Sequence, residues 1–518
     1  MKNATALDTA SVPASPLAEG PPRRLIARRL PLNTFRENVI VLARDSVALR
    51  PERLAGVRKV EVRAGGRTLL ASPIICDDPT MVGPFDVGLP EPAFHRLGVA
   101  AGEAVDLTPA RRPRTLDALR AKIAGEALNA FDYAEIAQDL AAHRWSDMEI
   151  AAFLVACASF MTPEETLWLC RGMVSAGHQL HWPRGLVVDK HCIGGIPGNR
   201  TSLIVTPIVA AHGLLMPKTS SRAITSPAGT ADTMEVLARV DLDEEEMRAV
   251  VETCGACIIW GGRVDLSPAD DVLISVERPL GVDTPEQMVA SILSKKVAAG
   301  SSHLVLDVPV GPSAKVHDRR AALRLKTLFE YVAGRLGLSI DVVLSDGRQP
   351  VGRGVGPVLE ARDVCAVLEN RPDAPADLRE KAIRLAGRLL EQDPALAGGM
   401  GERRARELLE GGAAGRKMEE IIAAQGPSRV SRTLGGLICE IVAPRAGTIA
   451  AIDCLRLASV ARLAGAPTDP GAGLDLLARI GDPVQAGQPL YRIHASEPSD
   501  FAFASEMAGE RSGVDLAR

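Results

Sequence analysis

The stretch from residue 186 to residue 211 constrains the fold more than any other part of the chain. Residues 186–188 form a short apolar run that is typical of a buried strand, and the apolar run 203–211 is long enough for a core helix. Between the two runs lie glycines, cations and hydroxyls, namely Lys190, Gly194, Gly195, Gly198, Arg200, Thr201 and Ser202. A strand that passes through a glycine-rich turn into a helix presents backbone N–H groups to an anion. The stretch therefore predicts an oxyanion site, and phosphate is the anion that it favours.

Composition excludes several classes of function. The chain has 518 residues, enough for about two to four domains with large cores. Its formal net charge is −4, it has no long Lys/Arg block, and only 3 Tyr and 9 Phe could stack on bases, so we expect no nucleic-acid polymer as a partner. No apolar run approaches the length of a membrane span, and the N-terminus lacks a signal-peptide pattern. We therefore expect a cytoplasmic protein with no membrane partner.

Strand and helix patterns alternate through the middle of the chain. Apolar runs typical of strands and amphipathic runs typical of helices follow one another at 186–188, 201–212, 214–217, 256–260, 285–299, 303–308, 319–337 and 342–346. This alternation predicts an α/β domain with a largely parallel sheet over residues 181–428.

The rest of the chain divides by its local pattern. We expect a flexible tail at 1–24, a small mainly-β domain at 25–112, a helical domain at 113–180 that helices from about 266–300 join, a C-terminal α+β domain at 429–505, and a tail at 506–518. The helical domain has apolar helix faces that need a partner, so a role in subunit pairing is one hypothesis.

The cysteines give little support for a metal or redox site. Nine are scattered along the chain, and only Cys254 and Cys257 form a CxxC pair. No second pair or nearby histidine completes a zinc set. We interpret them as two packed thiols in a core strand, and we expect no bound metal.

A second polar loop follows the predicted strand at 214–217. Residues 218–232 are dense in hydroxyls, with Ser220 and Thr230 as donors and Arg222 as a cation. Ser226 and Pro227 are typical of a helix cap with proline at the first helical position. Such a loop alone is often polar surface, but its pairing with the first loop favours a shared anion site.

Two further residues follow predicted strand ends, where ligands gather in α/β sheets. Asp283 precedes the helix at 285–299, and is either a helix-start carboxylate or a general acid. Lys315 follows the strand at 303–308, where a lone lysine is usually solvated.

Common nucleotide and hydrolase motifs are missing from the sequence. It contains no GxxxxGK[ST] and no GxSxG. The glycines from Gly352 to Gly356 do not form a dinucleotide fingerprint, because the third glycine is not at the required spacing. A P-loop kinase and a serine hydrolase of the α/β type are therefore not expected.

Two motifs carry a resemblance to a known family. Residues 189–195, Asp-Lys-His-Cys-Ile-Gly-Gly, resemble the D-K-H-S-x-G-G phosphate motif of the thymidine and pyrimidine-nucleoside phosphorylases. Residues 291–300 resemble the S-I-L-S-K-K-x-A-x-G motif of the same family. The resemblance covers roughly residues 115–503. The extra N-terminal domain and the sequences of residues 199–201 and 218–230 are similar to the branch of this family that has longer chains. That branch includes the AMP phosphorylases.

The resemblance implies phosphorolysis of a nucleoside, with inorganic phosphate as co-substrate and no other cofactor. The implied phosphate contacts are Lys190, Ser202, Ser220, Thr230 and the backbone of Gly194 and Gly195. The implied base and sugar contacts are His191, Ser221, Arg222, Ala223, Ile224, Thr225, Ser226, Ser291 and Lys295. His191 and Asp283 are the implied catalytic residues, with Asp283 as proton donor to the leaving base in the AMP branch. In that branch Gly195, Thr230, Ser291 and Lys315 match nucleotide contacts. A homodimer or larger homo-oligomer is also implied.

Two departures from the family pattern leave the substrate open. Cys192 replaces the motif serine, and residues 270–279 contain no tyrosine, although pyrimidine-specific members carry a tyrosine and an arginine there. The family arginine falls between Val276 and Arg278. Arg200 and Lys315 add cations that would suit a 5′-phosphate. The alternatives are therefore a nucleoside-monophosphate phosphorylase that produces ribose 1,5-bisphosphate, a phosphoribosyltransferase that uses magnesium, and a nucleotide-sensing or assembly protein.

Overall fold

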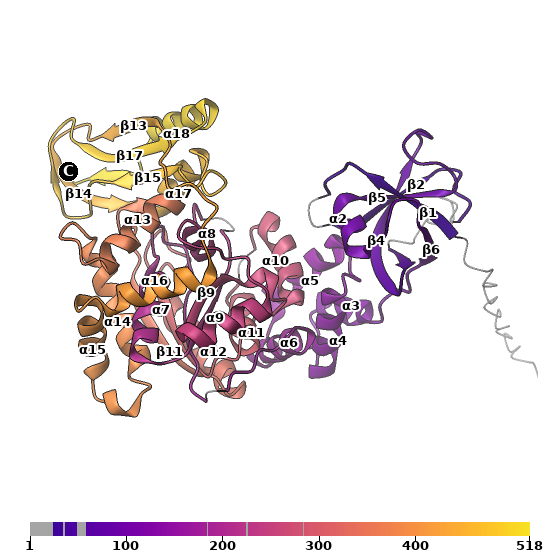
Figure 1. The fold of residues 1–518 in the computed structure, drawn as a ribbon, viewed down its shortest axis with the longest axis horizontal. Coiled ribbons are helices and arrows are strands. Elements are labelled where there is room, and N and C mark those ends of the chain that lie inside the picture. The colour runs from indigo at the N-terminus through magenta and orange to yellow at the C-terminus, as the bar shows by residue number, and fades with distance from the viewer. Residues whose placement is uncertain are drawn as a thin grey trace, which may run out of the picture. The chain divides into compact units, whose positions relative to one another are not determined.

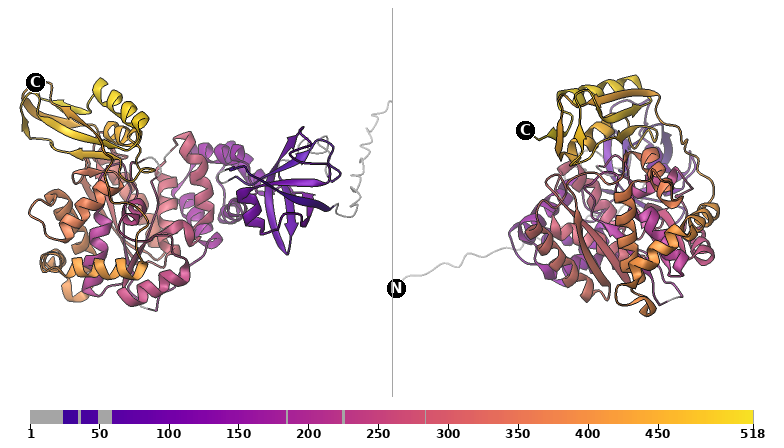
Figure 2. Two further views of the ribbon diagram at one scale, coloured as in Figure 1. Left: turned by 45° about the horizontal axis from the view of Figure 1, so that its top comes forward. Right: turned by 90° about the vertical axis from the view of Figure 1, so that its left-hand side faces the viewer.

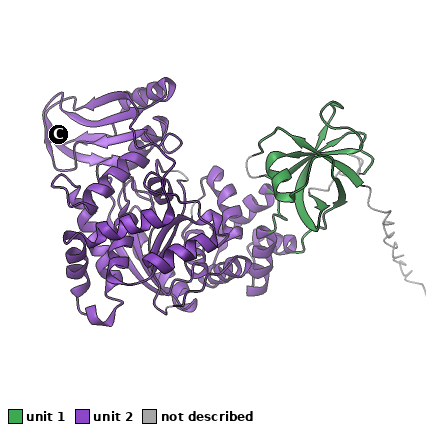
Figure 3. Ribbon diagram, viewed as in Figure 1, with its two compact units in different colours: residues 1–114, 142–146 green, residues 115–141, 147–518 purple. Residues whose placement is uncertain are grey.

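The computed structural model describes residues 24–34, 37–48, 59–183, 185–223, 226–282 and 284–517. Most of the predicted N-terminal tail lies outside these ranges, as do Ile224, Thr225 and Asp283. The chain divides into two compact units, residues 1–114 with 142–146 and residues 115–141 with 147–518 (Figure 3).

The first unit is a closed β-barrel, which confirms the mainly-β domain predicted at the N-terminus. Its six strands are joined in the order β1-β5-β2-β4-β3-β6. They are β1 (Arg24–Leu30), β2 (Val39–Ala43), β3 (Val60–Ala64), β4 (Arg67–Cys76), β5 (Asp86–Pro90) and β6 (Ala104–Pro109), and the helix α2 (Glu91–Leu97) follows β5. Alternate side chains such as Leu25, Val62 and Val105 point into a buried core, because successive residues of a strand face opposite sides.

The second unit is built on a parallel sheet, as the alternating pattern predicts (Figure 1). Strands β11 (Ser339–Asp346), β10 (His303–Val310) and β7 (Val188–Cys192) pair in parallel in that order, and β8 (Met216–Ser220) pairs in parallel with β9 (Ala256–Trp260). A parallel bridge between Val187 and Leu215 joins the two groups. The order across the sheet is therefore β11-β10-β7-β8-β9.

The order in which the chain adds strands to this sheet reverses between β7 and β10. From β7 the chain continues to β8 and β9 on one side, and then returns to β10 and β11 on the other. Cys192 at the end of β7 pairs in register with Asp307 of β10. In open α/β sheets the crevice at such a reversal point, at the carboxyl ends of the strands, is where ligands bind. The topology therefore places the glycine-rich turn after β7 at the expected ligand position.

Helices lie around the sheet (Figure 2). They are α7 (Thr201–His212), α8 (Thr230–Glu235), α9 (Glu244–Cys254), α12 (Arg319–Arg335), α13 (Pro357–Leu368), α14 (Ala376–Leu390), α15 (Met400–Glu410) and α16 (Ala413–Gln425), with the short turns η1 (Gly261–Arg263) and η2 (Pro394–Leu396). Helix α7 is almost completely buried, and α14 and α16 pack against it. Its apolar sequence on every side fits this position, since a helix that is apolar all round belongs in a core.

The helical part contains α3 (Thr115–Ile123), α4 (Ala130–Ala141), α5 (Asp147–Phe160) and α6 (Pro163–Ala176). Helices α10 (Pro268–Leu280) and α11 (Pro285–Ala298) pack against α4, α5 and α6, although they are more than ninety residues later in the sequence. A capping box between Thr162 and Glu165 begins α6. No described helix is both long enough and apolar enough to cross a bilayer.

The C-terminal part is α+β, with strands and the helices α17 (Cys454–Leu463) and α18 (Pro498–Glu510) (Figure 1). Its strands are β13 (Leu437–Val442), β14 (Gly447–Ile452), β15 (Gly473–Leu476), β16 (Pro483–Val484), β17 (Pro489–Ala495) and β18 (Val514–Leu516), and β12 (Gly354–Val355) pairs with β15. The tail expected at 506–518 is wrong. Helix α18 continues to Glu510, and β18 pairs with β14, so backbone hydrogen bonds hold this segment.

Cys254 and Cys257 are both buried thiols without a disulfide. Cys257 lies in β9, whereas Cys254 is the last residue of α9, so the pair spans a helix end and a strand. In the described part of the chain no group of His, Cys, Asp and Glu side chains is arranged to hold a metal ion.

Candidate active site

The glycine-rich turn after β7 is shaped by its neighbours. Gly194 and Gly195 have φ values of 89° and 87°, in the left-handed region that favours glycine. A Cβ atom on Gly195 would lie 2.7 Å from the backbone nitrogen of Lys315. The turn and the loop that carries Lys315 are therefore in close contact, so the structure brings these two predicted site residues together.

Lys190 lies inside the fold, at the N-terminus of α7. Its side chain is fully buried, and Nζ donates to Thr201 Oγ1 at 2.7 Å and to Ser202 Oγ at 3.4 Å. A hydroxyl that accepts a hydrogen bond from a cation keeps its own proton for another acceptor. Ser202 therefore has a proton to donate where the backbone N–H groups of the helix N-terminus also point.

Asp189 binds two buried lysines from other elements. Lys296 of α11 lies 2.7 Å from Asp189 Oδ2, and Lys218 of β8 lies 3.2 Å from Oδ1. Burial would raise the pKa of Asp189, but the two lysines hold it below its usual range. Burial lowers the pKa of Lys218 in spite of Asp189. The sequence predicted neither Lys218 nor Lys296 as a site residue.

Asp307 of β10 is the centre of a second cluster. Lys381 of α14 lies 2.9 Å from Asp307 Oδ2, Asn199 donates to the same atom at 3.0 Å, and Ser345 donates to Oδ1 at 2.5 Å. Burial would raise the pKa of Asp307, yet Lys381 and Lys190 keep it lowered. This cluster links β10 with β11, α14 and the loop before α7.

The two clusters contain more lysines than carboxylates. The lysine group consists of Lys190, Lys218, Lys296 and Lys381. Within the described ranges its ion pairs are those of Lys218 and Lys296 with Asp189 and of Lys381 with Asp307, whereas Lys190 donates to Thr201 and Ser202. Burial lowers the pKa of Lys190, because Cys192 and Asp307 compensate its charge only in part. Uncompensated buried charge is costly. The arrangement is therefore suited to an anion that supplies the missing negative charge.

Cys192 uses its sulfur within the turn. Gly194 N donates to Sγ at 3.4 Å and Asn199 Nδ2 donates to it at 3.1 Å. Burial raises the pKa of the thiol. The position at which the family motif has a serine therefore stabilises the turn from inside, as a neutral thiol.

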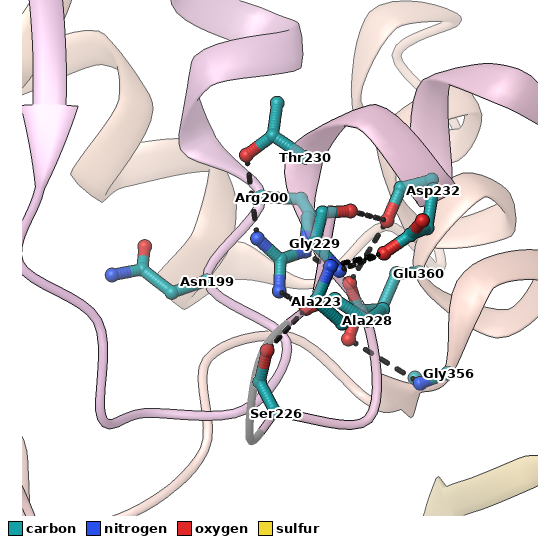
Figure 4. Close-up of polar contacts among 12 residues, drawn as sticks. Asn199, Arg200, Ala223, Ser226, Ala228, Gly229, Thr230, Asp232, Gly356 and Glu360 are labelled. Carbon is teal, nitrogen blue, oxygen red and sulfur yellow. Dashed lines mark hydrogen bonds and ion pairs between the residues drawn. The ribbon is translucent and has the colours of Figure 1, made fainter. Parts of the chain in front are cut away.

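The second loop is organised by Asp232 (Figure 4). Its Oδ2 accepts from the backbone nitrogens of Ala223 at 2.7 Å and Gly229 at 2.8 Å. The helix expected to begin at Pro227 begins instead at Thr230, after Gly229. Ser226 does not cap it, because its hydroxyl donates to the carbonyl of Ala228 at 2.8 Å. Sequence reasoning missed this because the carboxylate that fixes the helix start lies inside the helix, beyond the Ser-Pro signal.

Arg200 and Arg222 are both held in ion pairs. Arg200 Nε binds Glu360 of α13, Nη2 donates to Ala228 O at 2.6 Å, and Nη1 donates to Thr230 Oγ1 at 3.4 Å. Arg222 binds Asp232 and Glu235 and lies over the ring of Trp260, 5.1 Å from its centroid. A direct role of either guanidinium in substrate binding stays a prediction, since both are already paired with carboxylates.

Ser220 has a buried hydroxyl with no hydrogen-bond partner among the described residues. It ends β8, beside the loop that carries Thr230. A buried hydroxyl without a partner is costly in a native protein, and it commonly marks a site that a ligand completes. Ser202, Ser220 and Thr230, all predicted phosphate contacts, thus each have a proton that they can donate.

A separate cluster involves the predicted base contacts on α11. Ser291 Oγ donates to Asp270 Oδ2 at 2.9 Å, and Lys295 Nζ lies 2.5 Å from the same oxygen. Burial would lower the pKa of Lys295, but Asp270 and Asp271 raise it. Burial and the neighbouring lysines keep the pKa of His191 well below its usual range, so His191 is neutral. Asp270, which the sequence did not suggest, fixes both Ser291 and Lys295.

Three of the predicted site residues cannot be placed. Ile224, Thr225 and Asp283 lie outside the described residues. The cap of α11 is Thr284, whose hydroxyl accepts from Gln287 N at 3.2 Å. The helix-start alternative for Asp283 is thus not needed to explain α11, and its role as an acid stays a prediction.

Comparison with protein-family models assigns three parts of the chain. Residues 116–177 match the helical bundle domain of a glycosyl transferase family, and residues 184–414 match the α/β domain of that family. Residues 448–513 match the pyrimidine nucleoside phosphorylase C-terminal domain.

Relatives are similar over nearly the whole chain. A protein of Rhodopseudomonas palustris named "Putative thymidine phosphorylase" is 59% identical and covers 95% of this chain and 96% of its own length. A Bradyrhizobium protein of that name is 58% identical over 95% of this chain and 97% of its own length, and one from Albidiferax ferrireducens is 53% identical over 96% of each. The chain belongs to the thymidine and pyrimidine-nucleoside phosphorylase family. These phosphorylase relatives match the N-terminal barrel as well as the other domains.

A solved structure supports the fold of the phosphorylase. The anthranilate phosphoribosyltransferase of Thermus thermophilus aligns with a TM-score of 0.51 and 23% identity, over 60% of this chain and 99% of its own. At this identity the likeness concerns the fold, namely a helical domain combined with a parallel α/β domain.

Proposed function

We propose that the protein cleaves the N-glycosidic bond of a nucleoside by phosphorolysis of the thymidine phosphorylase type, releasing the free base and a (deoxy)ribose 1-phosphate. The observation that carries the proposal is a group of four buried lysines around β7 and β10. Among the described residues Lys218, Lys296 and Lys381 form ion pairs with the two carboxylates Asp189 and Asp307, and Lys190 donates to hydroxyls. The names of the relatives agree with it.

Inorganic phosphate is the proposed co-substrate. Lys190, the N-terminus of α7 and the hydroxyls of Ser202, Ser220 and Thr230 would hold it, because these groups all donate. Cleavage of the glycosidic bond develops positive charge on the sugar ring, and a fixed dianion next to C1′ stabilises that charge. The bound phosphate then forms the new bond to C1′ as the bond to the base breaks.

The base leaves with the electrons of the broken bond and needs hydrogen-bond donors or a proton. Ser291 and Lys295 are held in fixed positions by Asp270, and the raised pKa of Lys295 keeps it cationic. Neutral His191 can donate one hydrogen bond without adding charge. These three residues are the proposed contacts to the base and the sugar.

The nucleoside-monophosphate alternative rested on Arg200, Asp283 and Lys315. In the structure the charge of Arg200 is balanced by Glu360, so Arg200 does not supply a free cation for a 5′-phosphate. Lys315 is exposed beside Gly195 and remains a ground for that alternative. We therefore favour the nucleoside as substrate.

A substrate comparison tests this proposal. The purified protein would be incubated with phosphate and thymidine, uridine, AMP, CMP or UMP, and the free base would be quantified. We expect base release from a nucleoside and only in the presence of phosphate. Turnover of the monophosphates alone would overturn the nucleoside assignment, and Asp283→Asn would then be expected to lose activity most strongly with AMP.

Two further properties are proposed with the reaction. Activity should persist in a chelator, because the proposed mechanism has no magnesium step, whereas a phosphoribosyltransferase would lose it. We also propose a homo-oligomer, which the molar mass in solution would test. Turnover that needed magnesium and diphosphorylated ribose would instead assign the transferase reaction.

A further inference from the structure

The proposed mechanism assigns no role to the buried ion pair of Arg200 and Glu360. Glu360 lies in the first turn of α13 with 1% of its surface exposed, and Arg200 ends the first loop with 9% exposed. An ion pair so deep is often no more stable than apolar residues of the same size. Its place between the two substrate loops therefore calls for another explanation.

The guanidinium of Arg200 joins the two loops through separate nitrogens (Figure 4). Nε binds Glu360, Nη2 donates to Ala228 O at 2.6 Å, and Nη1 donates to Thr230 Oγ1 at 3.4 Å. A planar guanidinium can direct donors in several fixed directions at once, which an ammonium group cannot. Arg200 itself is the residue before α7, so it connects the N-terminus of that helix with the second loop.

Glu360 determines where this guanidinium lies. Besides Arg200, it accepts from Thr233 Oγ1 at 3.1 Å and from Gly356 N at 3.3 Å. Burial raises the pKa of Glu360 although Arg200 opposes the shift. These contacts hold the carboxylate between α8 and the start of α13, where it binds Arg200.

The orientation of Arg200 has a consequence for Thr230. The Thr230 hydroxyl accepts from Nη1, so its own proton is turned away from Arg200. Thr230 is only partly buried, at the start of α8 and next to the loop of the phosphate site. The hydroxyl therefore keeps its proton for an acceptor other than Arg200.

We propose that Glu360 and Arg200 are positioning residues that align Thr230 as a hydrogen-bond donor to the attacking phosphate, with Arg200 making no contact to the substrate. This inference rests on the proposed function only for the identity of the anion. It predicts that the pair controls phosphate affinity and leaves the affinity for the nucleoside unchanged.

The test removes both charges at once. In the double variant Arg200→Met with Glu360→Leu the net charge is unchanged, and an apolar replacement of a buried ion pair commonly preserves the fold. Phosphate binding would be measured by titration calorimetry without nucleoside. We expect the dissociation constant for phosphate to rise about tenfold, as for the loss of one charge-assisted hydrogen bond. The KM for thymidine should stay within about twofold.

Thr230→Val shows whether the effect passes through the hydroxyl. Alone it should weaken phosphate binding about as much as the double variant, and added to the double variant it should cause little further loss. Additive losses would overturn the proposal, as would a double variant whose phosphate affinity is unchanged.

A matched control comes from the same helix. Arg362 of α13 pairs with Asp475 at 2.7 Å, and its side-chain ion-pair partners among the described residues are Asp363 and Asp475, neither of which lies in either loop. Arg362→Met with Asp475→Leu should leave the phosphate affinity within about twofold. An equal loss of phosphate affinity in this control would mean that any destabilisation of α13 weakens phosphate binding. That result would overturn the positioning role of Arg200 and Glu360.

A further variant keeps the test decisive if the double variant does not fold. Arg200→Lys retains the positive charge but loses the planar guanidinium with its several fixed donors. Phosphate binding should therefore weaken about fivefold, and the midpoint of thermal unfolding should stay nearly unchanged. Unchanged binding in that variant would overturn the inference. Calorimetry measures phosphate binding without turnover. A protein that binds phosphate but releases no base would therefore refute the proposed reaction and leave the positioning role of Arg200 and Glu360 untouched.

Discussion

Two buried lysines in this protein have opposite surroundings. Lys122 of the helical part donates to Glu165 Oε1 at 2.5 Å and to Phe160 O at 2.7 Å, and Glu165 also accepts from Leu128 N, Thr162 N and Tyr133. Lys190 donates to two hydroxyls, and its neighbourhood contains more lysines than carboxylates. Both side chains are fully buried. Burial alone therefore does not show the function of a lysine. The ratio of lysines to carboxylates around it distinguishes a structural lysine from one that binds an anionic ligand.

Replacement of Lys190 by methionine should have the largest effect on activity. We expect phosphate-dependent base release to fall on the order of 10²–10³-fold, comparable to the loss of one oxyanion contact. The thermal midpoint without phosphate should be unchanged or higher, because the fold disfavours this charge. The rate of base release and the midpoint of thermal unfolding can be measured on the same preparation, by enzyme kinetics and by scanning calorimetry. A lower midpoint with normal phosphate kinetics would make Lys190 a structural residue like Lys122.

Lys122→Met is the matched variant in the other cluster. It leaves Glu165 buried without its cation, which should cost about 3–5 kcal/mol of unfolding free energy. Denaturant unfolding measures this loss. The phosphate KM of the protein that remains folded should be normal, and a selective rise in that KM would remove the contrast between the two lysines.

Phosphate should stabilise the protein by binding where charge is unbalanced. At about 100 times its dissociation constant the gain is about 2.7 kcal/mol, seen as a higher melting midpoint. The Lys122→Met protein should gain the same increment, and the Lys190→Met protein little of it. An equal gain in both variants would place the anion elsewhere.

The pH dependence of phosphate binding is the smallest of these effects. Lys190 has a lowered pKa in the fold and binds the anion when protonated, so affinity is full below that pKa and falls as pH rises through it. The limiting loss is about tenfold per pH unit, in a window below the usual lysine range near 10.4. Titration calorimetry from pH 7 to 10 follows it. Constant affinity over that range would contradict the role of a lysine with a lowered pKa.

The fold was predictable because its signals are local. The strand at 256–260 and the helix at 201–212 have the predicted bounds, since apolar runs and their flanking turns define them. The tail at 506–518 was wrong, because strand β18 has three residues and its pairing with β14 is not visible in the sequence.

The site was predictable only where a loop follows a strand. Lys190 lies within β7 and Ser220 ends β8, and these two strands are neighbours in the sheet, so the topology brings the two residues together. Asp307, Lys381 and Glu360 come from elements that follow Lys190 by about 100 or more residues, and they carry no motif. Their partners become evident only when the folded chain brings them into contact.

Phosphorolysis with phosphate labelled with oxygen-18 tests the central claim most directly. Thymidine would be turned over with the labelled phosphate, and the sugar product analysed by mass spectrometry. We expect a deoxyribose 1-phosphate that retains the label in the oxygen bound to C1′, and no such product from Lys190→Met. Thymine release with an unlabelled free sugar, at a rate independent of phosphate, would contradict it.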